Sequence, residues 1–311
     1  MNDMNNPLEL SIVATVYNDA PVVPLLVAEI IKNIHHLELN YEIILVNDFS
    51  LDDSENAIQK VCVENKNVKG ISLSRNHGQQ IAISAGMRFA TGKYVVIMDG
   101  DLQNPPSEIP RLYSEILKGY DIVYAVSKTR NNILDKTTSR IFWYILTQMM
   151  GVKMVKNQLM MRIMKASFID KYNKYNEINR TVESIVVDIS DNYGILQVEN
   201  QLRISGKSNY NFMKRANLMI DMFISLSNVP LNMMLFFGFF IFISTIIGII
   251  YNLVQYLYYD VPAGFTSTIL SIFLFGSLII LLLGFIGRYL SNIYTEVRRR
   301  PLFHVKEKYN L

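Results

Sequence analysis

The sequence predicts an α/β protein in which a doubly wound, mostly parallel sheet is followed by an amphipathic helix and two transmembrane helices. Short apolar runs rich in β-branched residues alternate with helical patterns through about the first 220 residues, a length that suits one domain. Beyond them, residues 222–259 and 261–287 contain no Asp, Glu, Lys or Arg. Each of these two runs can supply the ~20 apolar residues that span a bilayer.

Composition narrows the class of protein. The chain has 311 residues, 50% of them hydrophobic, and a formal net charge of +3. This modest charge argues against nucleic acid as a partner. The single cysteine, Cys62, excludes an internal disulfide, is compatible with a reducing compartment and is expected to fill a helix interior. Residues 1–7 are polar, so no signal peptide is expected.

The elements are predicted in strict alternation. Residues 10–16 form the first strand, and Pro21 begins a helix. The second strand, 43–46, ends in an acidic turn in which Asp53 or Ser54 can cap the next helix. The remaining elements are expected to be a strand at 68–73, a helix at 80–90 and a central strand at 95–98.

Polar loops follow three of these strands. They contain Tyr17 and Asn18 after the first, Asp48 after the second, and Asp99 with Asp101 after the central strand. In an open α/β sheet, ligands bind outside the carboxyl ends of the strands, so these side chains are expected to converge on one site.

The two carboxylates around Gly100 indicate a cation. Carboxylates this close repel each other unless a cation lies between them. Asp101 and the amide oxygen of Gln103 are hard oxygen ligands, which suit Mg²⁺ or Mn²⁺ better than zinc. Gly100 would let the backbone approach a ligand or adopt a positive φ. On this motif alone, an ordinary polar turn fits equally well.

Other site types are not supported. There is no lysine-containing phosphate loop, no Gly-x-Gly-x-x-Gly after the first strand and no Cys/His cluster with zinc spacing. His77 is more simply a loop residue with local hydrogen bonds than a catalytic group.

Nine segments, in order, carry a resemblance to a known family. They are TVYN (15–18), NDFSLD (47–52), SRNHG (74–78), DGDLQNPP (99–106), GYDIVY (119–124), RISGKSNY (203–210), SNVPL (227–231), GRYLSNIY (287–294) and RPL (300–302). With them the chain resembles the inverting GT-A glycosyltransferases of family 2. Within that family it is similar to the polyprenyl-phosphate glycosyltransferases, the branch of dolichyl-phosphate mannose synthase and the GtrB-like enzymes.

Four positions depart from the family pattern. Asn47 stands where Asp is usual, Asn209 where Lys is usual and Arg288 where Glu is usual. The fourth is Met160, at the position of an Asp that has been proposed as a base in the family.

The resemblance implies roles for individual residues. Asp101 and Arg203 would be catalytic, and Arg203 with Lys207 would bind the acceptor phosphate. A basic juxtamembrane segment attracted to anionic lipid is an alternative explanation for these two cations. A Mg²⁺ or Mn²⁺ ion would be held by Asp99, Asp101 and Gln103. The nucleotide sugar would be bound by Thr15, Tyr17, Asn18, Asp48, Arg75 and Asp99.

The donor and the acceptor follow from two of these positions. The Asp48 carboxylate can accept the imide N–H of uracil, which favours a UDP-sugar as donor. The resemblance implies that the sugar moved is a hexose or an N-acetylhexosamine. Because Met160 cannot take a proton, the acceptor is expected to be a polyprenyl phosphate such as undecaprenyl phosphate, which ionises without help. A base shifted to Glu183 or Asp188 stays open. So do transfer to a hydroxyl of a lipid-linked glycan and a catalytically silent membrane scaffold of the same fold.

The membrane part sets the predicted domain boundaries. Residues 1–210 are expected to form the cytoplasmic catalytic domain, 211–230 an interfacial amphipathic helix, 231–290 a two-helix transmembrane domain and 291–311 a basic cytoplasmic tail. The two spans are expected at 231–253 and 266–287.

Charge beside the spans predicts their orientation. Basic residues follow the second span, whereas Asp260 is the one charged residue of the short loop between the spans. The positive-inside rule therefore places both termini in the cytoplasm and the protein in the inner membrane, where it would serve cell-surface glycan synthesis or modification. Small residues at helix-packing positions, Gly238, Gly248, Gly276 and Gly284, suggest a homo-oligomer.

Overall fold

The computed structural model describes residues 8–127, 155–175, 177, 182–199, 229–258 and 264–311. These residues fall into two compact units. One holds the α/β part together with residues 300–311, and the other holds two long helices.

The α/β unit is built on a mixed sheet in which the described strands lie in the order β7-β5-β6-β4-β1-β2-β3-β8. β1 pairs in parallel with β2 and β4, β2 with β3, and β5 with β7. β6 is antiparallel to both of its neighbours, and β8 is antiparallel to β3. The predicted mostly parallel α/β sheet is therefore confirmed. The strands are β1 (Leu10–Val16), β2 (Tyr41–Asn47), β3 (Val68–Leu73), β4 (Tyr94–Asp99), β5 (Ile122–Ser127), β6 (Gln158–Lys165), β7 (Tyr193–Val198) and β8 (Val305–Tyr309).

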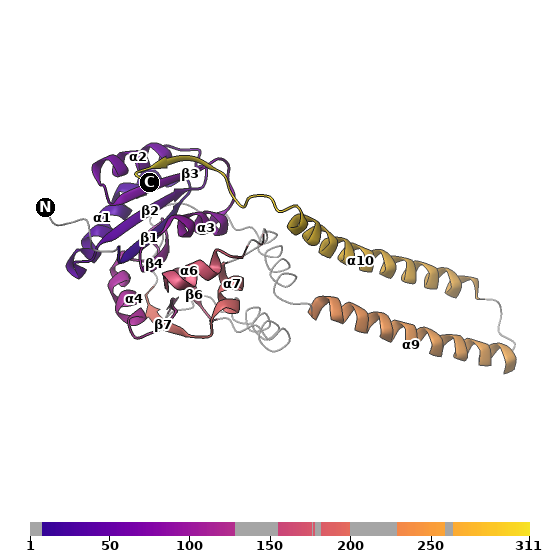
Figure 1. Cartoon of the computed structure of the whole chain (residues 1–311). Helices are drawn as coiled ribbons and strands as arrows, with labels where there is room; N and C mark the ends of the chain where they lie inside the picture. Colours follow the sequence, from indigo (N-terminus) through magenta and orange to yellow (C-terminus); the bar gives the residue numbers. More distant parts are fainter. Residues whose placement is uncertain (1–7, 128–154, 176, 178–181, 200–228, 259–263) are drawn as a thin grey trace. The chain divides into compact units, whose positions relative to one another are not determined.

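Helices cover both faces of this sheet (Figure 1). On one face α1, α2 and α4 enclose an apolar cluster, and on the other α3, α6 and α7 enclose a second one. The strands between them are buried on both sides, which explains their continuous apolar runs. The helices of this unit are α1 (Val22–Ile34), α2 (Ser54–Glu64), α3 (Gln79–Phe89), α4 (Ile109–Ile116), α6 (Ala166–Tyr172) and α7 (Val182–Ile189), with short 3₁₀ turns at His35–Leu37 and Pro106–Glu108.

The first part of the chain follows the expected alternation. Cys62 lies in α2 with only 2% of its surface exposed, so its predicted place in a helix interior is confirmed. The predicted side-chain cap of α2 is wrong. Neither Asp53 nor Ser54 makes it. Asp53 Oδ1 accepts the Asn56 side-chain amide at 2.6 Å, and the Ser54 hydroxyl donates to Asp52 Oδ1 at 2.5 Å.

The end of the chain forms a strand that the sequence analysis did not predict. Within the expected basic tail, β8 joins the sheet at the edge strand β3. Lys306 on β8 pairs with Glu55 of α2 at 2.9 Å. The Asn310 side-chain amide donates to the carbonyl oxygens of Cys62 at 2.5 Å and Val68 at 2.8 Å. Residues 300–311 thus belong to the α/β unit.

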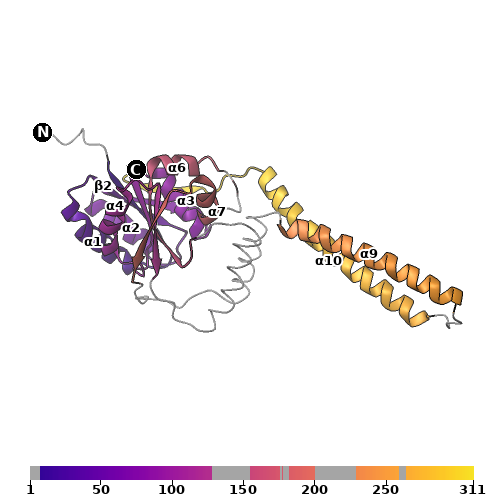
Figure 2. The same ribbon diagram turned by 90° about the horizontal axis from the view of Figure 1, so that it is seen from below.

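The second unit holds α9 (Val229–Tyr258) and α10 (Phe265–Val297), which run antiparallel beside each other in both views (Figures 1 and 2). By length and composition, one stretch of the described residues, Leu274–Val297, is apolar enough to cross a membrane. Large apolar side chains on both helices are exposed, among them Phe236 at 71% and Ile280 at 72%. The predicted interfacial helix falls on residues 211–230, which lie outside the described residues apart from 229 and 230.

Candidate active site

The candidate site lies at the carboxyl ends of the parallel strands. Thr15 and Asp99 are partners in the register of β1 and β4, so the two strands end side by side. Asp48 follows directly after β2. The structure therefore brings together the three strand ends that the sequence predicts to converge.

The loops after β1 and β2 are tied to each other. The Asn18 backbone N–H donates to Ser50 Oγ at 3.0 Å, and the Leu51 N–H donates back to Asn18 Oδ1 at 2.8 Å. Asn18 (φ 55°) and Phe49 (φ 59°) adopt the left-handed conformation that these tight turns require. Asn18 thus holds the loop together, while the Tyr17 side chain, which is 43% exposed, is accessible to a ligand.

Asp48 fixes the loop after β3. Its carboxylate is almost fully buried and accepts the backbone N–H groups of His77 and Gly78, both at 2.8 Å. Burial raises the pKa of Asp48, against the two hydrogen bonds, which lower it. The same loop carries Arg75, which is exposed. The bond from His77 comes from its backbone and reaches Asp48, 29 residues away, and His77 Nε2 is buried without a hydrogen-bond partner among the described residues, so the local side-chain bonding expected of His77 is not seen. Nucleotide binding by Asp48 and Arg75 stays a prediction.

His77 has an electrostatic neighbourhood of its own. Burial, Arg75 and His304 lower its pKa below the ordinary value near 6.5. His304 comes from the C-terminal segment, where its carbonyl oxygen accepts the Ser74 N–H at 2.9 Å. The C-terminal segment therefore contacts the loop that Asp48 holds.

Gly100 is required by a contact between β1 and the end of β4. Its N–H donates to the Thr15 carbonyl oxygen at 3.1 Å, and a Cβ at this position would lie 2.3 Å from the same oxygen. The close approach expected for Gly100 is thus to Thr15 rather than to a ligand, and Gly100 is not among the glycines with a positive φ.

Asp99 and Asp101 lie on either side of this contact. Asp99 accepts hydrogen bonds from the side-chain amides of Gln79, at the start of α3, and of Asn104, the latter at 3.0 Å. Asp101 is 9% exposed, and its Oδ1 accepts the Gln103 backbone N–H at 3.1 Å. The Asn104 amide oxygen is buried without a hydrogen-bond partner in the described part of the chain.

These donors fit a hard divalent cation. Two carboxylates with the amide oxygens of Gln103 and Asn104 form the type of oxygen set that Mg²⁺ and Mn²⁺ prefer. Within the described ranges, no three or more His, Cys, Asp or Glu side chains gather as a metal site. Such an ion would therefore complete its coordination with water or with phosphate oxygens, as Mg²⁺ commonly does.

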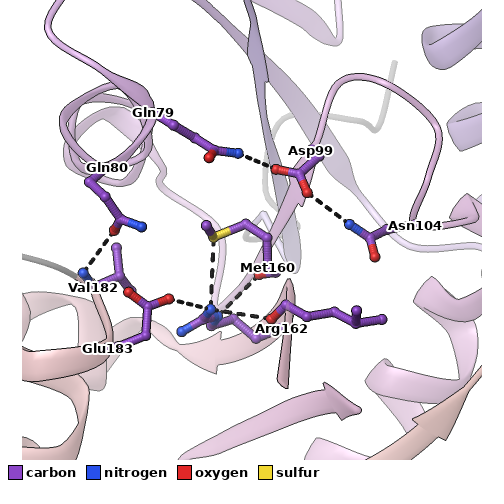
Figure 3. A network of polar contacts seen from close by, with 9 residues as sticks. Gln79, Gln80, Asp99, Asn104, Met160, Arg162, Val182 and Glu183 are labelled. Carbon is purple, nitrogen blue, oxygen red and sulfur yellow. Dashed lines mark hydrogen bonds and ion pairs between the residues drawn. The ribbon is translucent and has the colours of Figure 1, made fainter. Parts of the chain in front are cut away.

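A set of polar contacts lies near the end of β4 (Figure 3). α3 contributes two neighbouring glutamines to it: Gln79 donates to Asp99, and Gln80 Oε1 accepts the Val182 N–H at 2.9 Å. Val182 begins α7, so α3 links the β4 carboxylate to the start of α7. The next residue, Glu183, pairs with Arg162 of β6 at 2.9 Å.

Arg162 is the most buried charged residue of this set, with 1% of its surface exposed. Its Nε donates to the Met160 carbonyl oxygen at 3.1 Å, and its Nη2 donates to the Leu159 carbonyl oxygen at 3.3 Å. The Met160 sulfur lies 3.8 Å from Nη2. Met160, the position at which the resemblance implied a carboxylate, therefore faces an arginine that Glu183 neutralises from another element.

Comparison with known proteins identifies the family. The profile described as "Glycosyl transferase family 2" matches residues 11–172, which is more than half of the chain. The chain belongs to glycosyl transferase family 2. The matched range contains the whole set of strand ends described above.

Relatives of this glycosyltransferase match it over nearly its whole length. It is 31% identical to an undecaprenyl-phosphate 4-deoxy-4-formamido-L-arabinose transferase of Proteus mirabilis, over 96% of this chain and 93% of that protein. It is 30% identical to an uncharacterized glycosyltransferase of Synechocystis, over 98% of this chain and 96% of that protein.

A solved structure supports the fold. Glucosyl-3-phosphoglycerate synthase from Mycobacterium tuberculosis, in complex with Mn²⁺, uridine diphosphate and phosphoglyceric acid, aligns with a TM-score of 0.50 at 15% identity. The alignment covers 70% of this chain and 77% of that one. At this identity the likeness concerns the fold alone, and it agrees with the predicted GT-A fold.

Two predicted site residues stay predictions, and four residues near the site were not predicted. Arg203 and Lys207 lie outside the described residues. Gln79, Gln80, Asn104 and Arg162 were not predicted as site residues. Asn104 stood inside the quoted DGDLQNPP segment, whereas nothing in the sequence places Gln79 beside Asp99 or Glu183 beside Arg162.

Proposed function

We propose that this family 2 member is a membrane-bound inverting glycosyltransferase that moves a sugar from a nucleotide sugar to undecaprenyl phosphate or a similar polyprenyl phosphate. The donor is a UDP-sugar and the reaction takes place at the cytoplasmic face of the inner membrane, in cell-surface glycan synthesis or modification. Relatives named as undecaprenyl-phosphate transferases, matching over nearly the whole chain, support the acceptor.

The observation that carries the choice of acceptor is the side chain at position 160. The β4–β6 register ends at Ile97 and Arg162, and two further residues bring Met160 opposite Asp99. A hydroxyl acceptor needs a base near this edge, and Met160 offers none. Of the two alternative bases, Glu183 is held by Arg162 and Asp188 accepts the Tyr175 hydroxyl at 2.5 Å. A phosphate monoester, with a second pKa near 6, needs orientation rather than deprotonation.

We assign each group of predicted site residues a role in this reaction. Asp99, Asp101 and Gln103 would hold a divalent ion, which neutralises charge on the leaving diphosphate. Thr15, Tyr17, Asn18, Asp48 and Arg75 would bind the nucleotide. Arg203 and Lys207 would orient the acceptor phosphate, Arg203 bidentately.

The test is direct. Purified full-length protein with Mn²⁺ is incubated with undecaprenyl phosphate and a panel of nucleotide sugars, and lipid-linked sugar is sought by mass spectrometry. A UDP-sugar should give the product. Transfer only to the hydroxyl of a lipid-linked glycan would establish the rival reaction, and no transfer to any acceptor would favour a silent scaffold.

The acceptor also determines how the enzyme responds to pH and to two substitutions. With a phosphate nucleophile, the rate should rise through a pKa near 6 and then level off. Met160→Asp should give no gain. Glu183 already neutralises Arg162, so the added carboxylate is an excess negative charge, and at about 4 Å it repels the incoming dianion by about 4 kcal/mol. Arg203→Ala should be far more damaging. A large gain in Met160→Asp with Arg203→Ala nearly silent would show that the acceptor is a hydroxyl.

Membrane topology can be tested with one cysteine. Residue 263, in the proposed outer loop, lies outside the described residues, so Ala263→Cys is chosen from the sequence. It should label with an impermeant thiol reagent in intact cells. Cys62 should stay unlabelled, because it is buried and burial raises its pKa to about 12. Labelling of Lys306→Cys in place of Ala263→Cys would reverse the orientation.

A further inference from the structure

Arg162 is a buried cation that needs an anion. Its side chain is 1% exposed, and its guanidinium carbon lies 5.5 Å from the centre of the Tyr124 ring. An arginine in such a place is stable only if it is neutralised and its N–H groups are bonded. Glu183 supplies the charge at 2.9 Å and is itself only 15% exposed. The Arg162 Nη1 atom is buried without a hydrogen-bond partner among the residues that the structure describes.

The anion comes from α7, although β6 approaches the same atom. Arg162 Nη2 contacts Glu183 Oε1 at 2.9 Å and Met160 Sδ at 3.8 Å. A thioether sulfur is a weak acceptor, so Met160 cannot replace the carboxylate. A carboxylate at position 160 would, however, stand beside this nitrogen. The positions 160 and 183 are therefore alternative places for one negative charge.

Arg162 uses its other N–H groups to hold the strand that faces Asp99. Its bonds to the Leu159 and Met160 carbonyl oxygens, at 3.3 and 3.1 Å, fold the side chain back over the start of β6. Continuing the β4–β6 register by two residues beyond Ile97 and Arg162 brings Met160 opposite Asp99. The orientation of Arg162 consequently determines the backbone that lines this side of the site.

A second route leads from Glu183 to Asp99 through two helices (Figure 3). Glu183 is the second residue of α7, whose first N–H is held by Gln80 of α3, and the neighbouring Gln79 donates to Asp99. α7 and α3 therefore connect the Glu183 end of the network to the β4 carboxylate. Removing a hydrogen-bond partner of a metal ligand typically lowers activity by about 10- to 100-fold, and we expect a loss of this order for Glu183.

We propose that Glu183 is a positioning residue for sugar transfer: it neutralises and orients Arg162, and thereby fixes the β6 edge opposite Asp99. It does not take a proton from the acceptor. The inference uses the proposed glycosyl transfer as its assay, but it holds for either acceptor.

The proposal predicts that the carboxylate facing Arg162 can be supplied from position 160 in place of position 183. Glu183→Gln leaves the Arg162 cation without an anion, and kcat should fall about 10- to 100-fold while KM for both substrates changes less than about threefold. Met160→Asp alone places two carboxylates on one arginine and should not help. In the double variant Met160→Asp/Glu183→Gln, one carboxylate again faces Arg162, and kcat should return to within about threefold of wild type.

The experiment compares these three variants with wild type and with Glu115→Gln. This control makes the same chemical change in a carboxylate that pairs with Lys118 on the surface of α4, and it should be silent. Activity is measured well below the melting temperature of each variant, which far-UV circular dichroism provides. The pH–rate profile of Glu183→Gln should have the same shape as that of wild type, with a lower rate at every pH.

Three results would overturn the proposal. The first is a wild-type kcat in Glu183→Gln. The second is a double variant that is folded but stays as slow as Glu183→Gln. The third is the loss of one limb of the pH–rate profile in Glu183→Gln, which would make Glu183 a base. Failure of the proposed function is seen separately, because it appears as no transfer to undecaprenyl phosphate by the wild-type enzyme. The variants are then compared with whichever acceptor the wild type uses.

Discussion

Asp101→Ala should abolish sugar transfer, by roughly 10³-fold or more, while the protein still folds. The carboxylate lies in the loop after β4 and belongs to neither apolar cluster, and its hydrogen bond from the Gln103 N–H is worth about 1 kcal/mol. The proposed ion, in contrast, loses a charged ligand at the point where the leaving diphosphate gains charge.

Asp101→Asn is the matched control for this effect. It keeps the size of the side chain and an oxygen that can accept the Gln103 N–H, and it removes only the charge. It should be as inactive as Asp101→Ala but as stable as wild type in thermal unfolding. Wild-type turnover in the presence of EDTA would contradict the metal role, and so would an active Asp101→Asn enzyme.

Gly100→Ala should damage both the fold and the activity. The new Cβ would stand 2.3 Å from the Thr15 carbonyl oxygen, a backbone atom that cannot rotate away. β1 and β4 would have to separate, and the Gly100 N–H bond to Thr15 would be lost. Overpacking and the lost bond together predict a loss of about 2–4 kcal/mol in the free energy of unfolding.

Activity should fall further than stability explains, because the contact lies between Asp99 and Asp101. A shift of about 1 Å in catalytic groups can cost about 100-fold in rate. Gly119→Ala is the control: Gly119 has φ +109°, and a Cβ there meets nothing within 4 Å. It should cost backbone strain alone and leave kcat unchanged. Equal melting temperatures for Gly100→Ala and wild type would contradict the predicted overlap.

The sequence alone was sufficient to predict at which edge of the sheet the candidate site lies and which carboxylates lie there. Strand ends can be predicted because apolar runs stop at polar residues such as Asp48 and Asp99, and parallel strands bring their ends to one edge. Individual contacts were not accessible in this way. Asp48 lies next to His77 and Gly78 only because the loop after β3 folds back to it.

Pairs distant in the chain were missed for the same reason. Glu183 and Arg162 are 21 residues apart and belong to elements of different type, so no periodicity relates them. The strand β8 has a short, charged sequence that is typical of an edge strand but equally of a solvated tail. Only the position of β3 at the end of the sheet gives it a partner.

The pairing of β8 with β3 also determines the order in which the protein can be completed. During synthesis β3 leaves the ribosome early, whereas β8 follows only after α9 and α10 have been made. Until then the β3 edge carries unpaired N–H and C=O groups, which makes it prone to pairing with other chains. Under the proposed topology, the two helices enter the membrane before the sheet is finished. Under that topology, β8 would complete the sheet on a chain that the two helices already anchor.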